Sequence, residues 1–102
     1  MMHYHITPST NIETIFLQGL QPKVGDRSKK LNELPGVFMF ATEKDMEDGI
    51  INWLDNEFVE DEPLVSLKIS LPDNFPLESP VPYEVVSRCV IDAKYISIYK
   101  EI

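Results

Sequence analysis

The chain has 102 residues, of which 43% are hydrophobic, and its 9 lysines and arginines stand against 17 aspartates and glutamates, a formal net charge of -8. This length and composition are typical of one globular domain, which we expect to span residues 1–102, and exclude collagen-like and low-complexity proteins. The negative charge disfavours direct binding to long DNA or RNA, because such binding depends on basic side chains that neutralise phosphates.

Cysteine content and hydropathy predict a cytoplasmic protein. Cys89 is the single cysteine and cannot form an internal disulfide, which is typical of a reducing compartment. The start of the chain does not resemble a signal peptide, and no apolar stretch is long enough to cross a membrane. We expect Cys89 to lie in a buried strand and to behave as a small hydrophobic residue.

The chain begins with a predicted strand and a short helix. Apolar and polar residues alternate from Met2 to Thr7, which predicts a half-buried strand. Thr10 and Glu13 have the spacing of a capping box at a helix start. Gly19 has the position of a C-terminal cap, so this helix is expected to last about two turns.

The middle of the chain predicts a long loop, a strand and a larger helix. Residues Gln21 to Gly36 show little periodicity, and long loops often carry function. Val37–Ala41 is an apolar run that predicts a strand covered on both faces. Thr42 and Asp45 imitate a capping box, and an apolar stripe follows at helical spacing: Met46, Ile50, Trp53, Leu54 and Phe58.

The last part of the chain is rich in strand signals. Val65–Leu71 alternates as a half-buried strand does, and four prolines then predict irregular structure from Pro72 to Pro82. Tyr83–Val90 and Tyr95–Tyr99 predict a last pair of strands, with Asp92–Lys94 as the turn between them. This order of elements predicts an α+β domain whose strands cannot all be parallel neighbours.

Three residues are candidates for chemistry on their positions alone. His5 and Thr7 share the polar face of the first predicted strand, so both side chains can point into one cleft. The alternative is a pair of exposed polar residues. Glu84 begins a strand directly after the proline-rich stretch, which is a position suited to an oriented carboxylate. The alternative is an edge-strand charge that discourages aggregation. No spacing typical of a metal site, a phosphate-binding loop or a hydrolase nucleophile is present.

Three segments that together span nearly the whole chain carry a family resemblance. They are Tyr4–Thr7 with the short helix after it, Gly36–Thr42, and Tyr83–Val86 followed by Tyr95 and Ile96. In this order they resemble the motifs of the ADP-ribosyltransferase fold, in its diphtheria-toxin and poly-ADP-ribose-polymerase branch. The resemblance implies an α+β fold with a mixed or antiparallel split β-sheet and two helices.

The resemblance also implies an activity and its residues. The protein would use NAD as a substrate, cleave the bond between nicotinamide and ribose, and transfer ADP-ribose to an undefined acceptor. Glu84 would hold the nicotinamide ribose, where a fixed carboxylate stabilises oxocarbenium charge. His5 would hydrogen-bond the adenosine ribose, and Thr7 would orient the nicotinamide half. Phe38 or Phe40 would supply the stacking surface that is usually a tyrosine in the family.

Two further implications concern the pyrophosphate and the acceptor. Lys23 or Arg27, in the loop that holds four of the nine basic residues, would neutralise the pyrophosphate. Pro82 stands where arginine-modifying relatives carry a second acid or amide, so an arginine acceptor is not expected.

Two other functions stay open at this point. One is a non-catalytic module of the same fold that binds a nucleotide without reacting. The other is a small acidic inhibitor or antitoxin-like protein, whose acidic run from Asp55 to Glu62 would occupy a basic site on a partner protein.

Overall fold

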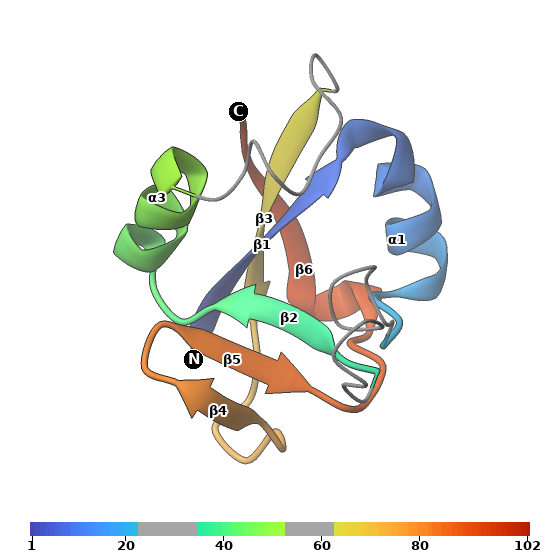
Figure 1. Ribbon diagram of the computed structural model, residues 1–102. Helices are drawn as coiled ribbons and strands as arrows, with labels where there is room; N and C mark the ends of the chain where they lie inside the picture. The colour runs from blue at the N-terminus through green and yellow to red at the C-terminus, as the bar shows by residue number, and fades with distance from the viewer. Residues whose placement is uncertain (23–34, 53–62) are drawn as a thin grey trace.

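The computed structural model of the chain describes residues 1–22, 35–52 and 63–102, and these form an α+β arrangement of one six-stranded sheet and two α-helices (Figure 1). The strands are β1 (Met2–Pro8), β2 (Val37–Phe40), β3 (Leu64–Ser70), β4 (Glu78–Val81), β5 (Glu84–Ser87) and β6 (Ile96–Glu101). The helices are α1 (Ile12–Gln18) and α3 (Glu43–Asn52), with 3-10 turns η1 (Ser9–Asn11) and η2 (Ala93–Tyr95). None of the described helices has the length and hydrophobicity needed to span a bilayer.

The sheet consists of two halves that are joined at its centre. Its strand order is β4-β5-β2-β1-β3-β6, and each of the described strand pairs is antiparallel. β1 pairs with β3 along its whole length, as β2 does with β5, whereas β1 and β2 have one registered pair in the described chain, Tyr4 opposite Phe40. Figure 1 shows β2 and β5 running across the direction of β1 and β3. The two halves therefore diverge on either side of this pair.

The helices cover opposite faces of β1. Ile15 of α1 belongs to the larger core cluster, together with Leu67 and Ile69 of β3. Met46 of α3 is fully buried in a second cluster with Tyr4 and Ile6 of β1. Because successive side chains of a strand point to opposite faces, the predicted alternation separates these two cores. The prediction of half-buried strands is wrong, because both faces are covered and the polar residues His3, Thr7 and Ser66 are buried.

The N-terminal helix begins differently from the sequence prediction. The prediction of a capping box at Thr10 and Glu13 is wrong. The chain first makes the η1 turn, and the helix starts at Ile12 without a side-chain cap. The predicted end is confirmed. Gly19 has φ 77°, and a Cβ there would lie 2.3 Å from the carbonyl oxygen of Ile91, so no other residue fits without displacement.

The second helix begins as predicted. The hydroxyl of Thr42 accepts a hydrogen bond from the amide of Asp45 at 3.1 Å and donates to its carboxylate at 2.8 Å. Met46 and Ile50 of the predicted apolar stripe face the second core. The remaining stripe residues, Trp53, Leu54 and Phe58, lie outside the described residues, as does the acidic run Asp55–Glu62.

Three predictions for the C-terminal part are corrected. The proline-rich stretch is not wholly irregular, because Pro80 lies in β4, an edge strand whose register shifts, where a missing amide donor costs little. The strand expected from Tyr83 to Val90 ends at Ser87, so Cys89 is exposed and not buried. β5 and β6 are not neighbours in the sheet, although the turn between them forms as η2, which Asp92 caps.

Candidate functional site

The candidate residues that the structure describes lie on three adjacent strands at the centre of the sheet. His5 and Thr7 belong to β1, Phe38 and Phe40 to β2, and Glu84 is the first residue of β5. The sequence separates the first and last of these by most of the chain, and the strand order β5-β2-β1 makes their strands neighbours. His5 and Thr7 alternate with Tyr4, which is registered opposite Phe40, so they point to the opposite face of the sheet from the two phenylalanines and Glu84. Lys23 and Arg27 lie outside the described residues.

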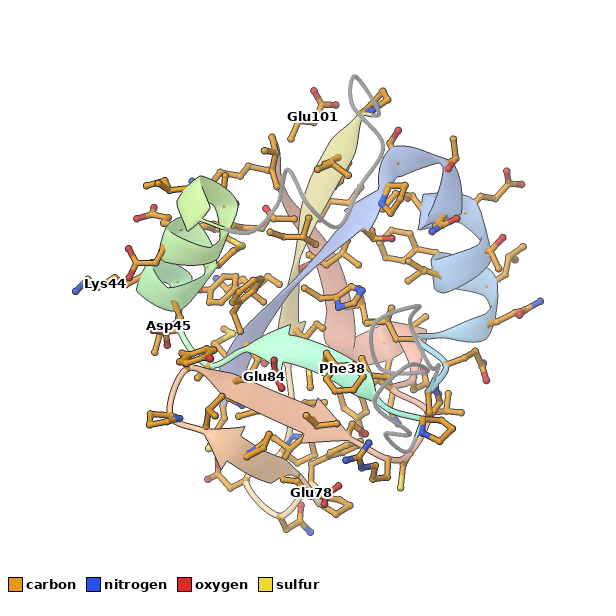
Figure 2. The ribbon with its side chains drawn as sticks, viewed as in Figure 1. Phe38, Lys44, Asp45, Glu78, Glu84 and Glu101 are labelled. Carbon is orange, nitrogen blue, oxygen red and sulfur yellow. The ribbon has the colours of Figure 1, made fainter. Side chains whose placement is uncertain are left out.

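Phe38, Phe40 and Glu84 share one face of β2 and β5. Phe40 is opposite Glu84 and Phe38 is opposite Val86, and paired residues of antiparallel strands point to the same face. Figure 2 shows Phe38 and Glu84 on the same side of the two strands. Glu84 and both aromatic residues are half-buried. A carboxylate held in this way beside aromatic rings is suited to stabilise positive charge on a bound ligand.

His5 lies where the two halves of the sheet separate. Its register opposite Leu67 places it on the face of β1 that carries the larger core, opposite in direction to Tyr4. Its Nδ1 donates a hydrogen bond to the carbonyl oxygen of Phe38 at 2.8 Å. A carbonyl oxygen only accepts, so this bond fixes the proton of the neutral ring on Nδ1. The side chain therefore connects β1 to the strand that carries both aromatic candidates.

His3 makes a similar contact on the other side of the Tyr4–Phe40 pair. Its Nδ1 donates to the carbonyl oxygen of Ala41 at 3.1 Å, and its Nε2 is buried without a hydrogen-bond partner. His3 is only 6% exposed, so it contributes to the join between β1 and β2 from inside the protein.

Thr7 is less accessible than its predicted role requires. Thr7 is buried, at 4% exposure, and its hydroxyl accepts a hydrogen bond from the side-chain Nδ2 of Asn11 at 3.4 Å. Thr7 shares a face of β1 with His5, as the alternation predicts. In this conformation its hydroxyl supports the η1 turn.

Arg88 and Glu78 lie on the same side of β5 as Glu84 and were not singled out from the sequence. The guanidinium of Arg88 forms an ion pair with Glu78 of β4 and donates to the carbonyl oxygen of Pro35 at 3.1 Å. The partners are far apart in the sequence, so no local pattern identifies them. The one available signal is Gly36, because a glycine at the start of a strand often marks a close approach of other atoms.

Tyr99, a titratable group whose pKa is strongly shifted, borders this region. Tyr99 packs edge-on against Tyr4, with ring centroids 5.3 Å apart, and its hydroxyl donates to Glu43 of α3 at 2.5 Å. This hydrogen bond to a carboxylate, together with desolvation and the negative charge of Glu43, raises the pKa of Tyr99 to about 12. Tyr99 therefore stays neutral and links β6 to α3.

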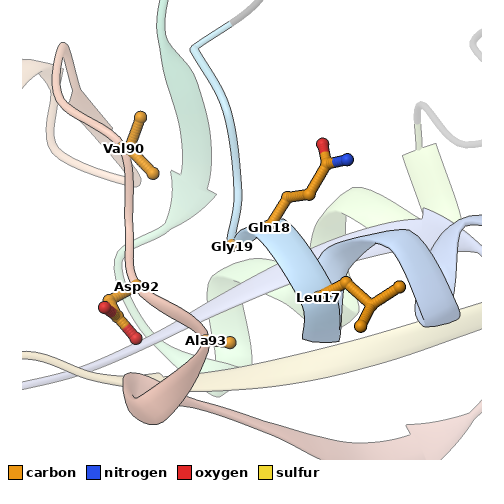
Figure 3. Close-up of a pocket in the computed structure, with 6 residues that line it drawn as sticks. All are labelled: Leu17, Gln18, Gly19, Val90, Asp92 and Ala93. Atoms are coloured by element: carbon orange, nitrogen blue, oxygen red, sulfur yellow. The ribbon is translucent and has the colours of Figure 1, made fainter.

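A surface pocket of about 320 Å³ lies elsewhere, between the C-terminal end of α1 and the segment that joins β5 to β6 (Figure 3). Its lining residues are Leu17, Gln18, Gly19, Val90, Asp92 and Ala93. The pocket therefore does not belong to the group formed by His5, Phe38 and Glu84.

Neither metal ligation nor sequence comparison adds to the site. Within the described ranges, no three histidine, cysteine or acidic residues are grouped so that they could hold a metal ion. No protein-family model matches the chain, and no curated protein or solved structure is significantly similar to it. The residues and their arrangement therefore carry the functional inference.

Proposed function

We propose that the protein is an NAD-dependent mono-ADP-ribosyltransferase-like enzyme with an ADP-ribosyltransferase-like fold. The observation that carries the proposal is the convergence of the three motifs. Glu84 is opposite Phe40, and Phe38 accepts the hydrogen bond of His5, so histidine, aromatic ring and carboxylate occupy neighbouring strands. Phe38 and Phe40 belong to β2, which lies between the strand of His5 and the strand of Glu84, and a ligand would reach His5 where β1 and β2 diverge.

In this reaction the bond between ribose C1′ and the nicotinamide nitrogen breaks, and nicotinamide leaves with the bonding electrons. The sugar gains oxocarbenium character, which the carboxylate of Glu84 stabilises because it already lies beside the sugar. A ring of Phe38 or Phe40 stacks on the ligand, and the imidazole of His5 contacts the adenosine ribose. The acceptor then bonds to C1′ and releases a proton.

The substitution Glu84→Gln tests the proposal. The carboxylate acts mainly in the transition state, so we expect nicotinamide release to fall by about 10²-fold or more while NAD binding is largely retained. Proton NMR of NAD with the purified protein follows both quantities, since saturation transfer reports binding and the time course reports cleavage.

Glu101→Gln is the matched control, because Glu101 is an exposed acid at the end of β6 and carries the same charge (Figure 2). Its release rate should equal that of the wild type. Equal rates for the wild type and Glu84→Gln would remove the catalytic role, and a lack of NAD binding would reject the proposal altogether.

A second candidate is a nucleotide-binding module that does not catalyse the reaction. Two observations favour it: both candidate stacking residues are phenylalanines, which offer no hydroxyl, and the hydroxyl of Thr7 is buried against Asn11. Saturable binding of NAD without nicotinamide release over a long incubation would select this function.

A further inference from the structure

Arg88 joins three segments at the edge of the candidate site. It follows β5 directly, and its guanidinium contacts Glu78 on β4 and the carbonyl oxygen of Pro35, which precedes β2. The Arg88 and Glu78 side chains are 37% and 57% exposed, so the ion pair by itself contributes little to stability. The planar guanidinium nevertheless fixes geometry, because it holds two acceptors in set directions. We call this group, Arg88, Glu78 and the Pro35 carbonyl, the Arg88 clamp.

Gly36 provides the space for the Arg88 clamp. A Cβ at this position would lie 2.8 Å from Nη1 of Arg88 and 2.6 Å from Cγ1 of Val86, closer than real Cβ contacts allow. Gly36 has no positive φ, so the glycine is required for space and not for backbone conformation. By alternation, positions 36, 38 and 40 share a face, so Arg88 lies on the face that carries Phe38.

The Arg88 clamp therefore lies where β2 enters the sheet. Phe38 is two residues beyond Gly36, and it is opposite Val86, which is fully buried. The carbonyl of Phe38 accepts the Nδ1 proton of His5. If Pro35 and Gly36 move, the carbonyl of Phe38, two residues along β2, moves with them. That carbonyl orients the imidazole of His5.

We propose that Arg88 is a positioning residue of the candidate site, which fixes the start of β2 and thereby the Phe38 carbonyl that orients His5. Its importance for NAD rests on the proposed function. Its effect on His5 does not, so the two can be measured separately.

The test compares Arg88→Ala with Arg88→Lys and with the control Lys94→Ala. The ¹⁵N shifts of the His5 ring report which nitrogen carries the proton, and the chain has only 2 histidines to assign. In Arg88→Ala we expect the His5 ring to lose its preference for a proton on Nδ1 and NAD affinity to fall about tenfold. Arg88→Lys should lie between this variant and the wild type, because a lysine retains the charge but lacks the planar fork. Lys94→Ala removes an equal charge from η2 and should change neither quantity.

The outcomes separate the two proposals. Unchanged His5 shifts in a folded Arg88→Ala variant would overturn the positioning role. If Arg88→Ala does not fold, the His5 shifts of Arg88→Lys and Glu78→Gln decide instead, and unchanged shifts in both variants would overturn the positioning role. Altered His5 shifts in a chain whose wild type does not bind NAD would support positioning and reject the proposed function. Altered shifts with unchanged NAD affinity would overturn the link between Arg88 and the site.

Discussion

The two histidines of β1 replace backbone hydrogen bonds where the sheet divides. In an antiparallel ladder, the pair after Tyr4 and Phe40 would join Ile6 to Phe38 through the backbone. Instead the imidazole of His5 reaches the Phe38 carbonyl, while His3 reaches Ala41 on the other side. A buried carbonyl needs a donor, so these side chains allow the strands to diverge without leaving the carbonyls unsatisfied. His5 thus has a structural role beside its proposed contact with the nucleotide.

Tyr99 gives a prediction for alkaline pH. The pKa of its phenol is raised from 10.0 to about 12 in the folded protein. In the unfolded chain the phenol loses its proton near pH 10, and in the folded protein it keeps that proton to about pH 12. Its contribution to the free energy of unfolding is therefore complete below pH 10 and is lost as the pH rises towards 12.

Urea denaturation at pH 9 and pH 11 measures this effect. Tyr99→Phe lacks the ionising hydroxyl, so its stability should fall less than that of the wild type over this interval. Other groups that titrate in this range are common to both proteins and cancel in the comparison. Parallel losses in the two proteins would show that the hydrogen bond to Glu43 does not hold the proton of Tyr99.

Single residues of the candidate site could be predicted from the sequence. The contacts that hold these residues in place could not. His5 and Glu84 were singled out because each stands at a definite point of a strand pattern, and the fold places both at the centre of the sheet. Arg88 was missed because its partners, Glu78 and Pro35, meet it only after β2, β4 and β5 have paired. Thr7 was expected to face a cleft, but strand alternation does not predict that η1 would cover its hydroxyl.

The two helix starts give a matched prediction for stability. Thr42 caps α3 through the amide and carboxylate of Asp45, so Thr42→Ala should lower the free energy of unfolding by about 1 kcal/mol. Thr10 stands in the corresponding pattern before α1 but lies inside η1, where no side-chain cap bond forms. Thr10→Ala should therefore change stability by less than about 0.5 kcal/mol. Chemical denaturation of the two variants checks this difference, and equal losses would contradict it.

Local patterns identified the elements better than they identified the pairing. β1 and β3 follow from alternation, and α1 is ended by Gly19 as expected. β4 was missed because a proline normally excludes a strand, and only its place at the sheet edge makes Pro80 tolerable. The separation of β5 from β6 could not be predicted, because it depends on which distant strands each of them meets.

The whole molecule is held together unevenly across the sheet. β1, β3 and β6 form one half and β2, β5 and β4 the other, and Tyr4 with Phe40 is the registered backbone pair between them in the described chain. The larger core opposes their separation, because it includes Met39 and Val85 from one half and Leu67 from the other. The proposed ligand would contact both halves where they diverge, because His5 on β1 points to the other face of the sheet from Phe38 and Glu84 on β2 and β5.

Native-state hydrogen exchange should therefore resolve the two halves. We expect the amides of Leu67 and Ile69 in β3 to exchange only through global unfolding, and that of Val86 in β5 to exchange at a lower free energy, because its half is smaller and has a short edge strand. NAD that contacts both halves, present at 100 times its dissociation constant, should stabilise the closed sheet. The free energy of the opening that exposes the Val86 amide should then rise by up to about 2.7 kcal/mol. Nicotinamide alone is too small to bridge the halves and should not produce this increase. Equal exchange in β3 and β5 without ligand would show that the halves open as one unit, and protection by NAD confined to β1 would place the ligand away from Glu84.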